Sequence, residues 1–395
     1  MIAAANTPLG GPLFAFAGGG TGGHLYPAIA VARALRDRVP DARFIFFSTQ
    51  RGIDGSILGH VDCEVVRQEL RALSARPWRW HGVLQGLRGA RHECRSRFLI
   101  DPPAAVIGTG GMASIPAVQE ARRAGIPIAI LNPDAAPGRA NRYLAKHADV
   151  VFAQWDDTVA AYPPGVAVRV VGCPVRPAFA AATRETGVAR FGLHRERRTL
   201  LVTGASQGAR SINQGMIALR SWLESRSNWQ ILHLTGESDH AFVASAYASR
   251  KGLGKVLSYT EHMADAVAAA DLVISRAGAS TLAELTAVGR AAILMPYPFH
   301  RDQHQLANAE CLERVGAARI VRDAIDPGVN APALQSVLGE LMSDDAKRAA
   351  IAEAARRMGR LDADETIACE VLKLARIHAR GSACESVEAA LTCTR

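Results

Sequence analysis

Short apolar runs alternate with segments of helical periodicity along most of the chain. The first run, at 13–17, precedes apolar residues that recur at helical spacing from Ala28 to Leu35. Similar runs lie at 43–47, 105–107, 126–131, 150–154 and 168–171, and then at 199–203, 230–234, 256–259, 271–275 and 291–296. Buried strands that alternate with helices are typical of βαβ units, so the pattern predicts an α/β protein with parallel sheets.

The alternation is interrupted at 172–177, where the sequence reads GCPVRP. A chain of 395 residues usually forms about two domains. We therefore predict a Rossmann-like domain at 1–176 and a second at 177–350. The remainder, 351–395, is predicted to form a C-terminal helix and a poorly ordered tail, and packing of this helix back on the first domain is one option.

Five glycines surround Thr21 between the first run and the first helix, in GGGTGG at 18–23. Glycines at such a turn let backbone N–H groups approach a ligand, and a helix N-terminus favours an anion. The turn therefore predicts a phosphate site. His24 follows directly, where a neutral imidazole could accept a proton, although a purely structural role is the alternative.

The same glycines satisfy the G-x-G-x-x-G pattern of dinucleotide sites. That pattern expects an acid about 20 residues later to hold a ribose. The next strand ends in Ser48, Thr49 and Gln50 instead, and no Lys-Ser/Thr pair follows the glycines as in a Walker loop. Both nucleotide motifs are therefore disfavoured.

A second glycine-rich turn, GASQGA at 204–209, opens the second half. It matches the G-x-S-x-G elbow of hydrolases, with His233, His240 and His262 as possible partners, but it opens a domain and no HGGG-type loop accompanies it. The favoured interpretation is an anion site, in which Ser206 and neighbouring N–H groups bind a diphosphate.

Two later segments carry polar side chains after strands. In RAGASTLAELTAVG at 276–289, Thr281 could cap a helix, and Glu284 lies where it could meet ribose hydroxyls or form a capping box with Ser280 or Thr281. In YPFHRDQHQLAN at 297–308, Asp302, His304 and Gln305 could bind sugar hydroxyls.

Composition narrows the class of protein. Hydrophobic residues make up 49% of the chain, and the seven cysteines include no C-x-x-C pair, which disfavours a disulfide framework or a zinc site. No signal peptide is evident and no run approaches a membrane span. We expect a cytoplasmic protein that is soluble or peripheral to a membrane.

Basic residues are concentrated at 67–97, part of a net charge of +9. This stretch holds eight arginines and two glutamates, interleaved with Trp78, Trp80 and aliphatic residues. Such a mixture suits the headgroup level of an anionic membrane, and a solvated basic loop is the alternative. RNA binding is a weaker choice because no nucleic-acid motif accompanies the patch.

Six motifs together resemble an ordered set. GGGTGGH, GTGG at 108–111, GCPVRP, GASQGA, RAGASTLAEL and HRDQHQLAN are similar to the motifs of the MurG family, the peptidoglycan N-acetylglucosaminyltransferases. The match spans 13 to about 325.

The resemblance implies a GT-B fold with two Rossmann-like domains facing a cleft. It implies that UDP-N-acetylglucosamine binds mainly to the second domain, and that its sugar passes with inversion to the muramyl C4 hydroxyl of lipid I, which makes lipid II. His24 is then the general base, and no cofactor or metal is expected. The implied substrate-binding residues are Thr21, Gly22, Gly23, Asp134, Arg176, Ser206, Gln207, Ala279, Ser280, Thr281, Glu284, His304 and Gln305.

The chain departs from the family where HEQN usually follows the strand at 126–131, because it has Leu131, Asn132, Pro133 and Asp134 there. This departure leaves the exact acceptor open.

The resemblance also implies a peripheral protein on the cytoplasmic face of the inner membrane, with anionic lipid and other cell-wall synthesis proteins as partners and no nucleic acid. A transferase for another lipid, a UDP-N-acetylglucosamine 2-epimerase and a binding subunit without activity remain alternatives.

Overall fold

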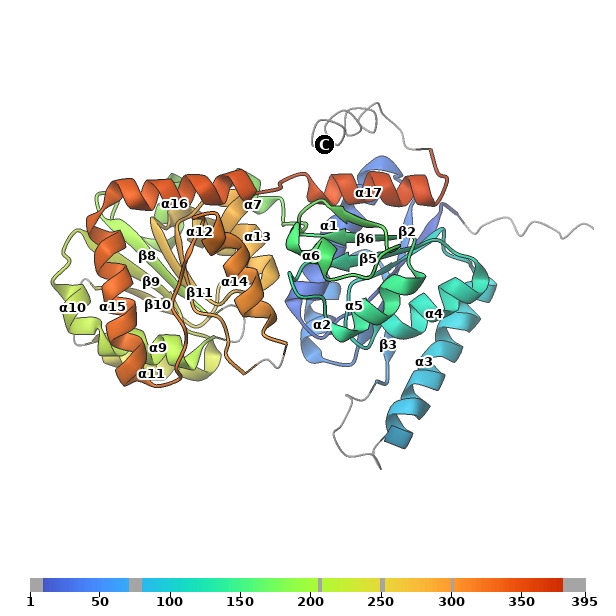
Figure 1. Cartoon of the computed structure of the whole chain (residues 1–395), viewed down its shortest axis with the longest axis horizontal. Coiled ribbons are helices and arrows are strands. Elements are labelled where there is room, and N and C mark those ends of the chain that lie inside the picture. Colours follow the sequence, from blue (N-terminus) through green and yellow to red (C-terminus); the bar gives the residue numbers. More distant parts are fainter. Residues whose placement is uncertain (1–9, 71–79, 205–207, 249–252, 300–301, 379–395) are drawn as a thin grey trace, which may run out of the picture. The chain divides into compact units, whose positions relative to one another are not determined.

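The computed structural model describes residues 10–70, 80–204, 208–248, 253–299 and 302–378 (Figure 1). These residues form two compact units. Unit 1 contains the described residues up to Pro133, Pro137–Pro174 and those from Asp362, whereas unit 2 contains Asp134–Ala136 and Val175–Leu361. Each unit is built on a parallel sheet, so the predicted fold class is confirmed.

Unit 1 has a seven-stranded sheet in the order β3-β2-β1-β4-β5-β6-β7. The strands are β1 (Leu13–Ala17), β2 (Arg43–Thr49), β3 (Glu64–Gln68), β4 (Ala105–Gly108), β5 (Ile128–Asn132), β6 (Val150–Ala153) and β7 (Val168–Val170). The helices are α1 (Gly22–Arg38), α2 (Gly52–Leu58), α3 (Trp80–Ile100), α4 (Ser114–Ala124), α5 (Arg139–Leu144), the 3₁₀ turn η2 (Ala145–His147), α6 (Asp157–Ala160) and α17 (Ala363–Leu374).

Alternating side chains of β1 and β2 enter separate cores on the two faces of this sheet. Phe14 and Phe16 pack with α1 and α17, whereas Ala15 and Ala17 face the side covered by α3 and α4. This is the period of two that a strand imposes, with both faces buried as in other parallel sheets.

Unit 2 has a six-stranded sheet in the order β10-β9-β8-β11-β12-β13. The strands are β8 (Arg198–Thr203), β9 (Trp229–Leu234), β10 (Gly254–Leu257), β11 (Leu272–Ser275), β12 (Ala292–Leu294) and β13 (Arg319–Ile320). The helices are α7 (Ala178–Ala181), α8 (Arg184–Phe191), α9 (Arg210–Ala218), α10 (Arg220–Glu224), the 3₁₀ turn η4 (Glu237–Asp239), α11 (His240–Ala248), α12 (Met263–Ala269), α13 (Ala279–Val288), α14 (His304–Arg314), α15 (Pro327–Ser343) and α16 (Asp345–Met358).

The C-terminal segment predicted at 351–395 is divided between the units. Helix α16 packs on α13 in unit 2, whereas α17 packs on α1 in unit 1. Ile367, Val371 and Leu372 of α17 are buried there, and each buried aliphatic side chain contributes roughly 1.5–3 kcal/mol. The predicted tail lies outside the described residues.

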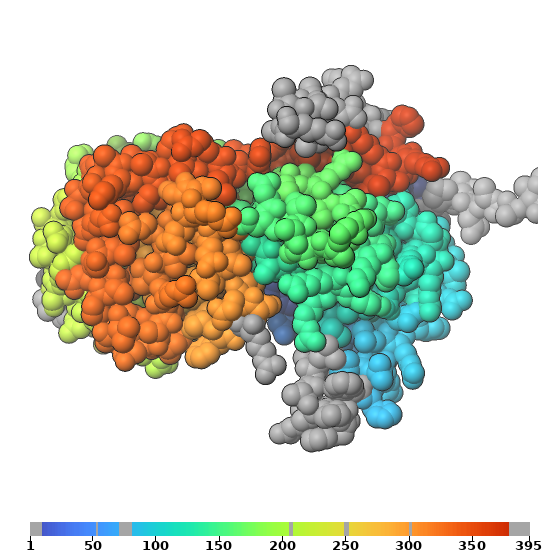
Figure 2. Space-filling view, viewed as in Figure 1, coloured from blue at the N-terminus to red at the C-terminus, as the bar shows by residue number. Residues whose placement is uncertain are grey.

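The basic stretch contains a long helix. Helix α3 packs on α4 through its buried face, which includes Cys94 and Phe98. Its outer surface is visible in light blue in Figure 2. Among the described residues, no helix has the length and apolar content that crossing a bilayer requires.

Candidate active site

Each sheet reverses its strand order at one point. The reversal lies between β1 and β4 in unit 1 and between β8 and β11 in unit 2. Ligands of open parallel sheets bind beyond the carboxyl ends of the strands at such a point. Four turns begin at these points, after β1 and β4 in unit 1 and after β8 and β11 in unit 2. They contain four of the six sequence motifs.

His24 lies in the first turn of α1 with a defined ring orientation. Its Nδ1 atom is 3.0 Å from the carbonyl oxygen of Gly19 and 3.4 Å from Oγ1 of Thr21. A carbonyl can only accept a hydrogen bond, so Nδ1 carries the proton, and in the neutral ring Nε2 then has the lone pair. This is the tautomer that a general base requires at Nε2.

The Nε2 edge of His24 faces the turn after β4. A Cβ atom on Gly110 would lie 3.2 Å from Nε2 of His24, and Gly110 has a φ of +107°, which L side chains rarely adopt. Because Gly110 has no side chain, no Cβ atom crowds Nε2 of His24, and the backbone of this turn can lie close to the imidazole ring. The GTGG motif at 108–111 thus lies beside His24, the candidate base.

Asn141 at the start of α5 reaches the same place and was not predicted as a site residue. It is 6% exposed, its Nδ2 donates to the carbonyl of Leu131 and to Oδ1 of Asn132, and its Oδ1 has no partner. The Cβ built on Gly110 would be 3.4 Å from this oxygen. A buried acceptor without a donor is costly, which makes Asn141 a candidate to receive a substrate hydroxyl.

The first glycine turn already binds an anion of the protein itself. Both carboxylate oxygens of Asp54 accept from the Gly20 N–H, at 2.8 and 3.0 Å. A phosphate at Gly20 would face this carboxylate, so the phosphate predicted for the turn does not fit there. Thr21 precedes α1 as its N-cap without a side-chain capping bond, and Gly22 and Gly23 form its first residues.

In unit 2, Arg176 and Glu284 form an ion pair. Nη2 of Arg176 donates to Oε1 of Glu284 at 2.8 Å, and both side chains are largely buried. Burial raises the pKa of Glu284, and the charge and hydrogen bond of Arg176 oppose that rise. Two residues predicted to bind the nucleotide-sugar are therefore in contact.

The capping-box alternative for Glu284 is wrong. Helix α13 begins at Ala279 with Gly278 as its N-cap, and no side chain caps it. Ser280 and Thr281 lie inside the first turn, so Thr281 is not the cap that its position predicted. Backbone N–H groups of this turn remain oriented toward the β11 end of the sheet, where an anion is favoured.

The turn after β8 is described at its ends only. Ser206 and Gln207 lie outside the described residues. A Cβ on Gly208 would come within 2.2 Å of the Thr235 carbonyl, so a glycine is required where the chain enters α9.

His233 does not support the hydrolase alternative. It is fully buried in β9, with Nε2 2.9 Å from Oδ1 of Asn213 and Nδ1 3.2 Å from the hydroxyl of Tyr247. Burial lowers its pKa to about 3. A histidine in this setting has no access to a substrate.

The segment after β12 orders its polar residues through local hydrogen bonds. The side-chain oxygen of Gln305 accepts from the Tyr297 N–H at 3.0 Å, and Nδ1 of His304 is 2.7 Å from Oδ1 of Asp302. These bonds fix the start of α14, which carries His304 and Gln305, two of the three residues predicted to bind sugar hydroxyls.

Asp134 belongs to unit 2, where it contacts Asn308 of α14. Nδ2 of Asn308 donates to Oδ1 of Asp134 at 2.9 Å, and Oδ1 of Asn308 accepts from the Ala135 N–H at 2.7 Å. Asn308 is completely buried. The departure from the family motif therefore falls on a residue that is held by a buried asparagine, a partner that the sequence did not indicate.

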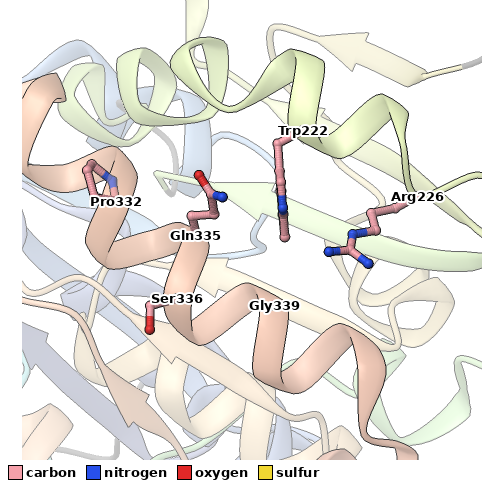
Figure 3. Close-up of a pocket in the computed structure, with 6 residues that line it drawn as sticks. All are labelled: Trp222, Arg226, Pro332, Gln335, Ser336 and Gly339. Carbon is pink, nitrogen blue, oxygen red and sulfur yellow. The ribbon is translucent and has the colours of Figure 1, made fainter.

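A hollow of about 380 Å³ lies elsewhere in unit 2, between α10 and α15 (Figure 3). Trp222 and Arg226 line one side and Gln335 and Ser336 the other. None of the residues that line it was predicted to act in catalysis, so volume alone does not indicate the site.

Family models match both halves of the chain. Residues 14–153 match the glycosyltransferase family 28 N-terminal domain, and residues 199–367 match the glycosyltransferase family 28 C-terminal domain. The crystal structure of MurG from Acinetobacter baumannii is similar in fold, with a TM-score of 0.72 and 24% identity over 92% of this chain and all of that one.

Two curated relatives are similar over nearly their whole length. One from Sorangium cellulosum is 38% identical over 371 residues, which is 91% of this chain and 88% of the relative. One from Desulforamulus reducens is 35% identical over 356 residues, which is 88% of this chain and 94% of the relative. Both are named UDP-N-acetylglucosamine–N-acetylmuramyl-(pentapeptide) pyrophosphoryl-undecaprenol N-acetylglucosamine transferase. The chain belongs to this family of glycosyltransferases, which confirms the resemblance predicted from the six motifs.

Proposed function

We propose that the protein transfers N-acetylglucosamine from UDP-N-acetylglucosamine to the muramyl C4 hydroxyl of undecaprenyl-diphosphate-linked N-acetylmuramyl-pentapeptide, lipid I. The product is lipid II, a precursor of peptidoglycan. The names of both relatives pair this donor with this acceptor and support the proposal.

The observation that carries the chemistry is the bond between Nδ1 of His24 and the Gly19 carbonyl. It leaves Nε2 to accept a proton at the switch point of unit 1. In the proposed reaction Nε2 removes the proton of the acceptor hydroxyl while its oxygen attacks the anomeric carbon. The bond from that carbon to the diphosphate oxygen breaks, UDP leaves with the electron pair, and the configuration inverts.

Unit 2 is proposed to bind the donor. Glu284 accepts hydrogen bonds from the ribose hydroxyls, and the first turn of α13 at Ala279, Ser280 and Thr281 faces the diphosphate. Arg176 stabilises the charge that develops on UDP as it leaves.

The remaining predicted residues complete the proposed site. His304 and Gln305 at the start of α14 contact the sugar, with Asp134 beside them. Ser206 and Gln207 contact the nucleotide-sugar, and Thr21, Gly22 and Gly23 contribute from unit 1.

Unit 1 is proposed to bind the acceptor and to dock on the cytoplasmic face of the inner membrane. Leu84 and Leu99 of α3 are 52% and 72% exposed, and Arg88 and Arg95 are also exposed. At about 100° per residue these four side chains fall within one narrow stripe of the helix. Arginines and leucines on one face suit the interface of an anionic bilayer.

A radiolabel assay with purified lipid I tests the function. We expect the sugar label to move from UDP-N-acetylglucosamine into the lipid fraction, with release of UDP. Label that remains on the nucleotide as an epimer would indicate a 2-epimerase, and donor binding without turnover would indicate a binding subunit. Transfer to another lipid but not to lipid I would show that lipid I is not the acceptor.

A further inference from the structure

A buried carboxylate is connected to His24 through a single peptide group. Asp54 of α2 is 1% exposed and binds the Gly20 N–H with both oxygens. The carbonyl of the same peptide group belongs to Gly19, and it is the acceptor for Nδ1 of His24. The carboxylate of Asp54 and the imidazole of His24 are therefore bound to opposite ends of one peptide group, the N–H of Gly20 and the C=O of Gly19.

Thr49 also fixes the position of the Asp54 carboxylate. Its Oδ2 atom accepts from the backbone N–H and the hydroxyl of Thr49 at the end of β2, at 3.0 and 2.6 Å. A Cβ on Gly19 would come within 2.5 Å of this oxygen, so the close approach requires glycine. On the other side of the turn, Nη1 of Arg51 donates to the Gly20 carbonyl at 2.9 Å.

An amide whose N–H binds a carboxylate becomes a stronger acceptor at its carbonyl, because consecutive hydrogen bonds polarise one another. A stronger acceptor at Gly19 favours the proton on Nδ1 of His24. A carboxylate bound directly to a catalytic histidine fixes the tautomer in the same way.

We propose that Asp54 is a positioning residue that fixes the orientation and the tautomer of His24 through the Gly19–Gly20 peptide. This inference rests on the proposed role of His24 as the base. Asp54 lies 34 residues from Gly20 in sequence and does not touch the substrate in this scheme.

Asp54→Asn is the informative variant because it conserves size. Oδ2 faces two donors of Thr49, so the amide oxygen takes that place and the NH₂ group is turned toward the Gly20 N–H. Two donors then oppose each other and the polarisation is lost. Glu120→Gln is the matched control, since Glu120 is another buried acid of unit 1, bound to Arg91 and Arg123.

Two readouts test the proposal. The first is the ¹⁵N spectrum of histidine-labelled protein, with the His24 signals assigned by their loss in His24→Gln. We expect the Nδ1–H tautomer in the wild type and a shift toward Nε2–H in Asp54→Asn. The second is kinetics. We expect kcat to be lowered by roughly 10–100-fold, by analogy with removal of the partner that orients a metal-binding histidine, and the KM for UDP-N-acetylglucosamine to stay nearly unchanged.

Several outcomes would overturn the proposal. The proposal fails if His24 of the wild type carries its proton on Nε2. This test needs no variant, so it applies even if Asp54→Asn does not fold. The proposal also fails if His24 has the same tautomer in Asp54→Asn as in the wild type. In that case either the rate is normal, or it falls only together with the melting temperature, as in Glu120→Gln, and the effect of Asp54 is on stability alone. If His24→Gln retains full activity, the proposed base fails, while the comparison of the His24 tautomer between the wild type and Asp54→Asn still tests the link to Asp54.

Discussion

Oε1 of Glu284 accepts a 2.8 Å hydrogen bond from Nη2 of Arg176, a residue 108 positions earlier in the chain. The pair fixes the carboxylate of Glu284 in α13, which is proposed to bind the ribose of the donor. Donor binding should therefore depend on Glu284. The stability of α13 should not depend on it, because Glu284 does not cap this helix.

The variant Glu284→Ala is expected to weaken UDP binding by roughly 1.5–3 kcal/mol, the loss typical of hydrogen bonds to a charged group. Isothermal titration with UDP measures the effect. Glu353→Ala, an exposed acid of α16, is the control. Unchanged or tighter UDP binding by Glu284→Ala would contradict the ribose role.

The buried His233 predicts a pH dependence of stability. Its pKa is about 3 in the folded protein instead of 6.5, so the unfolded state binds more protons between these values. The unfolding free energy of unit 2 should therefore fall as the pH decreases through this window, by up to ~1.4 kcal/mol per pH unit.

Urea unfolding of the wild type and of His233→Gln between pH 6.5 and 4.5 measures this dependence, with a shallower slope expected for the variant. His147→Gln, on the surface of unit 1, is the control. Equal slopes for all three proteins would show that His233 does not contribute.

The bond from Asn308 to Asp134 predicts a mild effect of Asp134→Asn. The amide oxygen can still accept from Nδ2 of Asn308, and removal of a negative charge reduces repulsion toward the donor's diphosphate. KM for UDP-N-acetylglucosamine should stay the same or fall, with kcat maintained. A selective rise in the KM for lipid I would instead indicate that Asp134 contacts the acceptor.

The exposed stripe of α3 predicts salt-sensitive membrane binding. Changing Arg88 and Arg95 to Gln should reduce sedimentation with anionic vesicles, since each basic residue near such a surface is worth about 1 kcal/mol. Arg91 is a poor choice because it pairs with buried Glu120. Arg356 and Arg357 of α16, changed to Gln, provide a control pair in unit 2. Equal partitioning of all three proteins would mean that the stripe is only solvated.

Local patterns predicted much of the fold. The strand, glycine turn and helix around Gly18 to His24 were predictable because each depends on neighbours in sequence. The boundaries shifted by a few residues where helix ends depend on packing, as at Thr281, which the pattern suggested as a cap and which lies inside α13.

Long-range partners could not be predicted. Asp54 lies in the short helix α2, whose glycines give a weak periodic signal, and it meets Gly20 only because β1 and β2 are adjacent. Asn141 lies in the first turn of α5, and the position of its unpaired oxygen beside Gly110 depends on the order of β4 and β5. The sequence therefore indicated candidate residues such as His24 and Glu284, but not which residues they contact.

Transfer of labelled N-acetylglucosamine to purified lipid I, compared between the wild type and His24→Ala, tests the proposed reaction and its base together. The wild type should place a β-linked sugar on the muramyl C4 hydroxyl, in EDTA as well as without it. His24→Ala should lower kcat by roughly 10²–10⁴-fold with UDP binding nearly intact, as expected for loss of a general base. Absence of label from the lipid fraction with the wild type would exclude the proposed reaction, and full transfer by His24→Ala would exclude His24 as its base.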